Sequence, residues 1–252
     1  MEARLKHPIF DPVRPWLERL ASDRRPSHEA LTALAAEAGV RTASGMAVRF
    51  VPPSSADPYY EVKVYESGCV ATRSGNWHDL FNALAWLAFP RTKAAINELH
   101  AMQIPREGGR RGRLRDMLTI FDEGGAIVLS ADAGLESLVR GFRWRELFWD
   151  CRKRVLSHFR VVVLGHAVLE KALAPWPGIA CKALFLAPES DVDAGAAAWL
   201  RARATDGTPQ LLAPLPVFGY PGWLPAGEHA EFYDDPRYFR PFKRDRPYGN
   251  AG

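Results

Sequence analysis

The stretch RSGNWHDLFNALAWLAFPRTKAAINELH (residues 73–100) is the most apolar run of this chain, yet polar side chains recur all through it. The polar residues are of types used in catalysis and binding. They are Arg73, His78, Asp79, Asn82, Lys93, Asn97 and His100. An apolar run with this spacing of polar groups predicts a buried helical element that carries a polar site.

Local signals divide the stretch into two helices. Asn76 is a residue type that caps helix starts, and Asp79 falls at the third helical position, where a carboxylate favours the exposed amides. Pro90 removes a backbone donor and disfavours helix just before it. We therefore expect one helix from Asn76 to the region of Phe89 and a second over 92–102, arranged as a helical hairpin or a bent helix.

The chain before this stretch predicts an irregular arm, a helix and a β-hairpin. Ser27 can cap a helix that Gly39 closes. Residues 59–65 alternate Tyr and Val with Glu and Lys, which predicts a strand with one solvated face. A turn at Ser67 then leads to a second strand over 69–73, so the two should pair as a hairpin.

After the stretch, helices and strands follow each other without regular alternation. Residues 104–112 predict a loop rich in Gly and Arg, and residues 122–125 a turn. Apolar runs predict strands over 126–130, 160–164 and 182–187. Helices are expected over 114–121, 132–140, 144–158, 166–174 and 194–204. This order favours α+β over a doubly wound parallel sheet.

Beyond Gly207, prolines recur so often that regular elements are not expected, but the segment is too aromatic for a free tail. We expect an extended C-terminal segment held across the core by its rings. The fold class is thus α+β, a single mixed domain with a central helical hairpin and short strands. We divide it into residues 1–55 (N-terminal arm and helix), 56–207 (core) and 208–252 (C-terminal segment).

Composition and cysteine usage indicate an ordinary globular chain. Hydrophobic residues make up 47% and charged residues 25%, and the formal net charge is +4. The three cysteines contain no Cys-x-x-Cys pair, so a zinc ribbon or a disulfide framework is not expected. No run approaches the ~18 apolar residues of a membrane span, and no signal pattern begins the chain. We expect a cytoplasmic protein without a membrane partner.

Several strings resemble those of a bacterial, mostly proteobacterial, family of domains of unknown function. The strings are NWHDLFNA (76–83), RDxLTxFDE (115–123), GHAxLEK (165–171), PGW (221–223), FYDD (232–235) and FRP (239–241). The resemblance covers roughly residues 60–245. It implies family membership and no particular activity.

Histidine and carboxylate residues on the central stretch are the first candidate site. His78 and Asn82 are four residues apart, so both project from one helical face. A histidine with a nearby carboxylate, here Asp79, can act as a general base or a metal ligand. The alternative is that Asp79 only neutralises the helix start and His78 is a structural side chain.

The second candidate is a set of carboxylates beside arginines. Three carboxylates, Asp116, Asp122 and Glu123, could hold a divalent cation (Mg²⁺, Mn²⁺ or Zn²⁺) while guanidinium groups such as Arg115 bind phosphate oxygens. The alternative is a solvated turn at 122–125 with arginines that face water.

His166 and Glu170 are the third candidate. They are four residues apart on a helix that follows a buried strand, a spacing that two ligands of one metal can use. Glu170 could instead pair with a nearby cation. Asp234, Asp235 and Arg240 in the aromatic segment are interpreted as turn residues.

The leading hypothesis is a metal-assisted or His/carboxylate hydrolase acting on an anionic, phosphate-containing substrate. Catalytic residues would be His78, Asp79, His166 and Glu170, and Asp122 and Glu123 would bind a divalent cation. Substrate contacts would come from Arg73, Asn82, Lys93 and Arg115. Motifs for nucleotide-dependent enzymes and serine hydrolases are absent from the sequence.

The alternative hypothesis is a binding module without catalysis. Arg106, Arg110, Arg111, Arg113 and Arg115 place five guanidinium groups in one short segment, 106–115. Such a segment could contact a nucleic acid or an acidic partner, with the histidines serving only as structural residues. The partner of the protein is therefore either an anionic small molecule or a nucleic acid.

Overall fold

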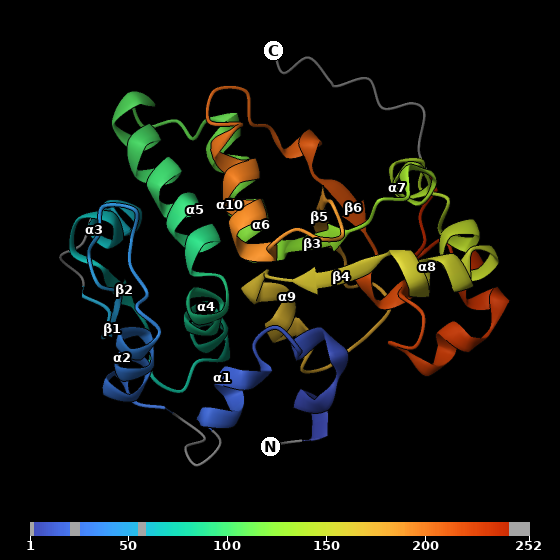
Figure 1. Ribbon diagram of the computed structural model, residues 1–252, viewed down its shortest axis with the longest axis horizontal. Helices are drawn as coiled ribbons and strands as arrows, with labels where there is room; N and C mark the ends of the chain where they lie inside the picture. Colours follow the sequence, from blue (N-terminus) through green and yellow to red (C-terminus); the bar gives the residue numbers. More distant parts are fainter. Residues whose placement is uncertain (1–2, 21–25, 55–58, 242–252) are drawn as a thin grey trace.

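A four-stranded sheet with helices on both faces forms the centre of the protein (Figure 1). The computed structural model describes residues 3–20, 26–54 and 59–241. Helices are α1 (Arg14–Arg19), α2 (His28–Glu37), α3 (Tyr60–Ser67), α4 (Trp77–Ala88), α5 (Pro90–Gln103), α6 (Arg113–Gly124), α7 (Ala133–Arg140), α8 (Arg152–His158), α9 (His166–Lys171) and α10 (Val192–Arg201). Strands are β1 (Arg49–Val51), β2 (Cys69–Ala71), β3 (Gly125–Leu129), β4 (Arg160–Val163), β5 (Cys181–Leu186) and β6 (Ala213–Leu215).

The sheet has the strand order β4-β3-β5-β6 and mixed pairing. β3 pairs antiparallel with β4 and parallel with β5, which pairs antiparallel with β6. Together with the helices this is an α+β fold, as the irregular order of elements in the sequence predicts. Every residue of the central strand β3 is buried, which fits its uninterrupted apolar sequence.

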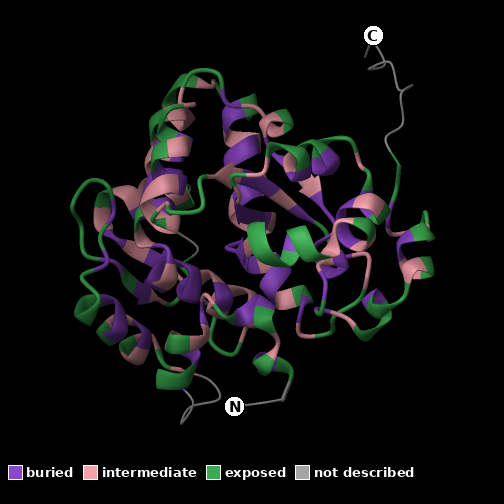
Figure 2. Cartoon of the chain, turned by 45° about the vertical axis from the view of Figure 1, so that its right-hand side comes forward, coloured by how far each residue is buried: buried purple, intermediate pink, exposed green. Residues whose placement is uncertain are grey.

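Alternate residues of the strands supply two different cores. Ile127 and Leu184 pack with apolar residues of α5, α6 and α10 on one face of the sheet. Val128 and Ala183 pack on the other face with α7, α8 and aromatic residues of the C-terminal segment. Figure 2 shows the buried residues running through the middle of the molecule, with exposed residues on the outer turns. This alternation is the period of two that a sheet covered on both faces requires.

The N-terminal segment packs into the core. The ring of Phe10 stacks on Phe81 of α4, with the ring centroids 5.6 Å apart. His7 Nε2 lies 2.7 Å from the carbonyl oxygen of Trp223, so the N-terminal segment also contacts the C-terminal segment. These contacts fix α4, the helix that carries His78.

The hairpin expected over residues 59–73 is wrong. Residues 60–67 form the helix α3, which ends at Gly68 in the left-handed conformation (φ 71°). β2 pairs in parallel with β1, so its partner is a strand that precedes α3. Tyr60 and Val64 are four residues apart and share one helical face, so the same apolar residues also satisfy a helical period.

Three other element predictions need correction. The turn expected at 122–125 is wrong, because α6 continues through Gly124. The single helix expected over 144–158 is a π-helical turn, Glu146–Asp150, followed by α8. β6 forms despite the prolines after Gly207, because it lies at the edge of the sheet, where Pro214 needs no partner for a missing amide.

Aromatic rings hold the C-terminal segment against the core, as the sequence predicts. The Tyr233 ring lies 6.0 Å from Phe148 and 5.3 Å from Phe239, measured between centroids. The Tyr233 hydroxyl lies 3.1 Å from the carbonyl oxygens of Gly219 and Gly227. The last part of the predicted segment, residues 242–252, lies outside the described residues.

Candidate functional site

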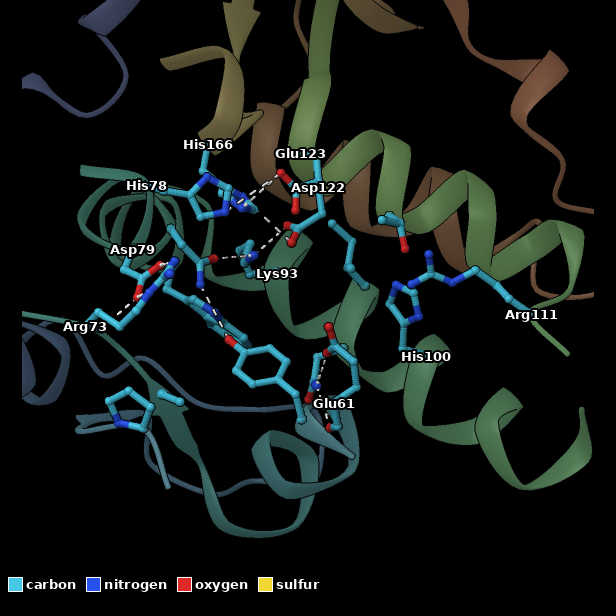
Figure 3. A pocket seen from close by; sticks show the side chains of 18 residues that line it. Glu61, Arg73, His78, Asp79, Lys93, His100, Arg111, Asp122, Glu123 and His166 are labelled. Carbon is cyan, nitrogen blue, oxygen red and sulfur yellow. Dashed lines mark hydrogen bonds and ion pairs between the residues drawn. The ribbon is translucent and has the colours of Figure 1, made fainter. Parts of the chain in front are cut away.

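All the polar residues singled out in the stretch 73–100 line one cavity of about 380 Å³. The other polar lining residues are Tyr60 and Glu61 of α3, Thr119, Asp122 and Glu123 of α6, His166 of α9, and Arg111 in the loop before α6. Figure 3 shows His78, His166 and Glu123 together at one side and Arg111 and His100 at another. The volume lies in the range of small-molecule binding sites.

Capping interactions fix the start of α4 and with it His78. The Asn76 side chain accepts a hydrogen bond from the amide of Asp79 at 3.0 Å. Asp79 in turn accepts from the guanidinium of Arg73 at 2.8 and 2.9 Å and from its amide at 2.7 Å. Burial raises the pKa of the Asp79 carboxyl, but these bonds outweigh burial and lower that pKa below its ordinary value. Arg73 and Asp79 thus form a wall of the cavity.

A buried lysine occupies the middle of the cavity. Lys93 is 4% exposed and donates to Asp122 and, at 2.8 Å, to the side-chain oxygen of Asn82. Its ammonium also lies 5.6 Å from the centroid of the Trp86 ring. Burial raises the pKa of Asp122, but the charge of Lys93 and the nearby His166 outweigh it, so this pKa lies below its ordinary value.

Gly165 lets the start of α9 approach the end of α6. A Cβ on Gly165 would lie 2.6 Å from the amide nitrogen of Gly125 and 2.7 Å from Gly124 Cα. The amide of Gly165 donates to the carbonyl of Gly125 at 2.9 Å. His166 follows Gly165 and Glu123 precedes Gly124, so this backbone contact brings their side chains together. Glycine is needed here for close approach, since any side chain would collide.

His78, Glu123 and His166 form a cluster with the geometry of metal ligands. One ligand atom from each residue lies within 4.8 Å of the other two. Glu123 Oε2 is 3.9 Å from Nε2 of His78 and 3.6 Å from Nε2 of His166. The imidazole centroids are 4.5 Å apart. The nearby His166 ring lowers the pKa of the Glu123 carboxyl below its ordinary value, against a smaller opposing effect of burial.

The second nitrogen of each imidazole faces another carboxylate. His78 Nδ1 lies 3.1 Å from Glu170 Oε2, a hydrogen-bond distance. His166 Nδ1 lies 3.8 Å from Asp122 Oδ2, and this buried nitrogen has no hydrogen-bond partner among the described residues. Both rings therefore present Nε2 to Glu123 and Nδ1 to a separate acid.

A second polar group lines the cavity near Arg111. The Asn97 amide donates to the backbone and the carboxylate of Glu61 at 2.8 and 2.7 Å. Burial raises the pKa of Glu61 and lowers the pKa of His100 to about 4, so His100 is neutral near pH 7. His100 Nδ1 accepts from Arg115 Nε at 3.3 Å.

The candidate residues predicted from sequence are distributed as follows. The cluster region contains His78, His166, Asp122, Glu123 and Glu170, while Arg73, Asp79, Asn82 and Lys93 line the cavity beside it. Arg115 does not line the cavity; it pairs with Glu107 at 2.9 Å and donates a hydrogen bond to His100. Asp234 pairs with Arg145, and Asp235 pairs with Arg237 at 2.6 Å, both on elements outside the cavity.

Sequence reasoning missed Glu61 and did not distinguish Arg111 from its neighbours. The alternating pattern predicts Glu61 on the solvent-exposed face of a strand, whereas in α3 its carboxylate accepts a hydrogen bond from Asn97. Arg111 lines the cavity, in contrast to the other arginines of its loop. One available signal was the spacing of Lys93, Asn97 and His100, which places all three on one face of α5.

No helix of the described residues has both the length and the apolar character that crossing a membrane requires. Comparison with curated proteins gives no match, and comparison with solved structures gives none. The model of one family, described as "Protein of unknown function (DUF3025)", matches residues 48–244. That match spans most of the chain and contains the strings that suggested a family of domains of unknown function. The chain belongs to the DUF3025 family.

Proposed function

We propose that this protein is a metal-dependent hydrolase whose metal ion is bound by His78, Glu123 and His166. Two imidazoles and one carboxylate are a ligand set found in catalytic zinc sites, where a water completes the coordination. Imidazole ligands favour Zn²⁺ over Mg²⁺, which prefers oxygen, as Mn²⁺ also does to a lesser degree.

The spacing of the ligand atoms supports this assignment. Ligands held about 2.0–2.1 Å from one tetrahedral zinc lie roughly 3.4 Å from each other. The separations from Glu123 Oε2 are 3.6 and 3.9 Å, so shifts of a few tenths of an ångström bring this oxygen to ligand spacing from both imidazole nitrogens, and all three ligand atoms lie within 4.8 Å of one another.

The observation that carries the proposal is the position of the second carboxylates. Imidazoles that bind a metal through one nitrogen usually give the other N–H to a carboxylate, which fixes the tautomer and the ring orientation. Glu170 Oε2 lies at hydrogen-bond distance, 3.1 Å, from His78 Nδ1, whereas Asp122 Oδ2 faces His166 Nδ1 at 3.8 Å, beyond that distance. In this proposal both acids orient ligands, whereas the sequence suggested a catalytic role for Glu170 and a metal-binding one for Asp122.

The charge around the cluster favours an anionic substrate once the ion is bound. Asp79 is paired with Arg73, and Asp122 with Lys93, so these acids are already neutralised. Among the described residues, Arg111 has one distant acid, Asp116, at 3.9 Å. A bound divalent cation would then attract a negative group such as a phosphate ester, and Arg111 adds positive charge at the other side of the cavity. A metal-activated water would attack phosphorus, the bond to the leaving oxygen would break, and that oxygen would take the released proton.

Metal titration of chelator-treated protein tests the proposal. We expect one Zn²⁺ or Mn²⁺ per chain by calorimetry and by elemental analysis, and hydrolysis of p-nitrophenyl phosphate or bis-p-nitrophenyl phosphate only with metal. His166→Ala and Glu123→Gln should each lower metal affinity by at least about 100-fold, more than loss of an orienting partner does. His158→Ala, a histidine outside the cavity, is the control. Absence of stoichiometric binding by either ion would overturn the proposal.

A further inference from the structure

Four exposed arginines, of which only Arg111 has an ion pair among the described residues, form a loop beside the cavity. We name residues 106–113 the arginine loop; Arg106, Arg110, Arg111 and Arg113 are all exposed in it. Its one acid, Glu107, is held by Arg115 at 2.9 Å. Over the described residues, Arg106, Arg110 and Arg113 form no ion pair and no side-chain hydrogen bond. The loop thus carries a local positive charge that the protein itself does not neutralise.

Arg111 connects this loop to the cavity. It lines the cavity together with His100 and Thr119, and Figure 3 shows it on the side away from His78 and His166. Arg111 itself is exposed, and its neighbours in the loop are therefore close to this side of the cavity. An anion that enters from this side meets the loop first and the metal-ligand cluster last.

Exposed aromatic rings lie on another element at the cavity. Tyr60 lines the cavity and is 40% exposed, and the preceding Tyr59 is 59% exposed. The Tyr60 hydroxyl accepts a long hydrogen bond, 3.4 Å, from the side-chain amide of Asn82. Exposed rings beside a positive surface are the pair of features that single-stranded nucleic acids use, because bases stack on rings while phosphates contact cations.

We propose that the arginine loop binds successive phosphates of a single-stranded nucleic acid, and that the strand reaches the cavity with one phosphodiester at the metal cluster. The position of cleavage rests on the proposed hydrolase function, whereas the binding surface does not. Single-stranded nucleic acid fits better than inorganic polyphosphate because Tyr59 and Tyr60 offer ring faces that only bases use. A duplex does not fit a cavity of about 380 Å³ that holds its cluster inside.

The chemistry at the cluster would be hydrolysis of one phosphodiester bond. The oxygen of water bonds to phosphorus, and the bond from phosphorus to one ester oxygen breaks. That oxygen takes a proton, so the products are a hydroxyl end and a phosphomonoester end. No oxidant, reductant or further reactant is needed.

Fluorescence anisotropy with a fluorescein-labelled 12-nucleotide single strand tests binding in the metal-free protein. We expect affinity to fall steeply between 50 and 200 mM salt. The triple variant Arg106→Ala, Arg110→Ala, Arg113→Ala should bind at least tenfold more weakly at low salt. Its slope of log affinity against log salt should be smaller by about 2, since each phosphate contact on a single strand contributes roughly 0.7. None of the three residues lines the cavity.

The matched control removes the same charge elsewhere. Arg140 ends α7, Arg143 follows it and Arg237 belongs to the C-terminal segment, and all three are exposed. Figure 1 shows α7 on the right and the loop that follows α5 at the upper left. Their triple alanine variant should bind the strand within twofold of wild type. If both triple variants lost the same affinity for the strand, binding would depend only on net charge, and the proposal would be overturned.

Two further measurements separate the possible ligands. Tyr59→Ala should weaken binding of the strand while leaving competition by inorganic polyphosphate unchanged. A duplex of the same length should bind at least tenfold more weakly than the single strand. Polyphosphate or duplex that binds as tightly as the strand would contradict the proposal.

Hydrolysis is measured separately from binding of the strand. Strand binding that persists in chelator and in His166→Ala, with no metal-dependent hydrolysis of the strand or of small phosphate esters by the wild type, supports the binding surface and overturns the hydrolase function. Metal-dependent hydrolysis of small phosphate esters with no binding of the strand leaves the hydrolase function and overturns this inference.

Discussion

His78 on α4 and Glu170 on α9 are joined by a 3.1 Å contact between Nδ1 and Oε2, across 92 residues of sequence. The same imidazole turns Nε2 toward Glu123. The hydrogen bond requires the proton on Nδ1, which leaves Nε2 with the lone pair that a metal ion needs.

Glu170→Gln is therefore expected to weaken metal binding without unfolding the protein. Glutamine keeps the size of the side chain but loses the charge that makes the imidazole a stronger ligand, and loss of such a partner typically costs 10–100-fold in affinity. Zinc titration against a competing chelator measures the change. Lys171→Met, one residue along the same helix, is the control and should have wild-type affinity. Unchanged zinc affinity in Glu170→Gln would show that this contact does not orient a ligand.

The glycine contact between α9 and the end of α6 gives a second prediction. Gly165→Ala would place a methyl group 2.6 Å from the Gly125 amide nitrogen, so α9 must move away from Glu123. We expect a loss of about 1–3 kcal/mol in the free energy of unfolding, as for other overpacked sites, together with weaker zinc binding.

Gly124→Ala is the matched control, because its Cβ would meet only Val168 Cγ2, at 4.0 Å. Thermal denaturation with and without zinc measures both effects. Equal melting temperatures for Gly165→Ala and wild type would contradict the close approach of the two backbones.

The buried pair of Lys93 and Asp122 gives a third prediction. Lys93→Met leaves the Asp122 carboxylate, only 17% exposed, without its cation and should cost about 3–5 kcal/mol in unfolding free energy. The double variant Lys93→Met, Asp122→Leu should be more stable than the single one, since no charge remains buried. Urea denaturation measures all three proteins.

Arg91→Met is the control for that experiment. Arg91 pairs with Asp191 at 3.3 Å, but both side chains are more than half exposed, so the change should cost less than about 1 kcal/mol. If Lys93→Met were as mild as Arg91→Met, the pair in the cavity would not be a buried one.

Much of the fold could be predicted because its signals are local. Ser27, Asn76 and Asp132 are predicted helix caps, and each side chain accepts a hydrogen bond from a backbone amide of its own helix. The uninterrupted apolar run of β3 likewise predicts a strand buried on both faces. Such features depend on a few neighbouring residues and so can be read directly from sequence.

The helix α3 could not be predicted because contacts distant in sequence determine it. Its Tyr and Val residues alternate as in a strand, and β-branched residues favour strands. The backbone carbonyl and carboxylate of Glu61 instead bond to Asn97 of α5, and Gly68 ends the helix in a left-handed conformation. Tertiary packing thus outweighs local preference in this segment.

The candidate site was recognised in part for a similar reason. Side-chain chemistry identified His78, Glu123 and His166 as candidate ligands, because few residue types bind metals. Their convergence depends on how closely Gly165 approaches Gly124, and sequence spacing alone does not specify that contact. For the same reason Arg115, which looked equivalent to Arg111, pairs with Glu107 instead of lining the cavity.

His100 gives a pH-dependent prediction. Burial lowers the pKa of His100 from 6.5 to about 4, and its side chain is 2% exposed. In the unfolded chain the same imidazole takes up a proton near pH 6.5, so below that pH the unfolded state binds more protons than the folded state. The stability that comes from a neutral His100 is therefore present above pH 6.5 and decreases as the pH falls toward 4.

His100→Asn should remove this pH dependence, because asparagine does not titrate and its side-chain oxygen can still accept from Arg115 Nε, as His100 Nδ1 does at 3.3 Å. Between pH 7 and pH 5 we expect wild type to lose about 2 kcal/mol more unfolding free energy than the variant, since each unit of pKa difference corresponds to about 1.4 kcal/mol. Urea denaturation at both pH values measures the two losses. Parallel losses in wild type and variant would mean that His100 is protonated as easily in the folded protein as in the unfolded chain, which its burial beside Arg115 and Asn97 argues against.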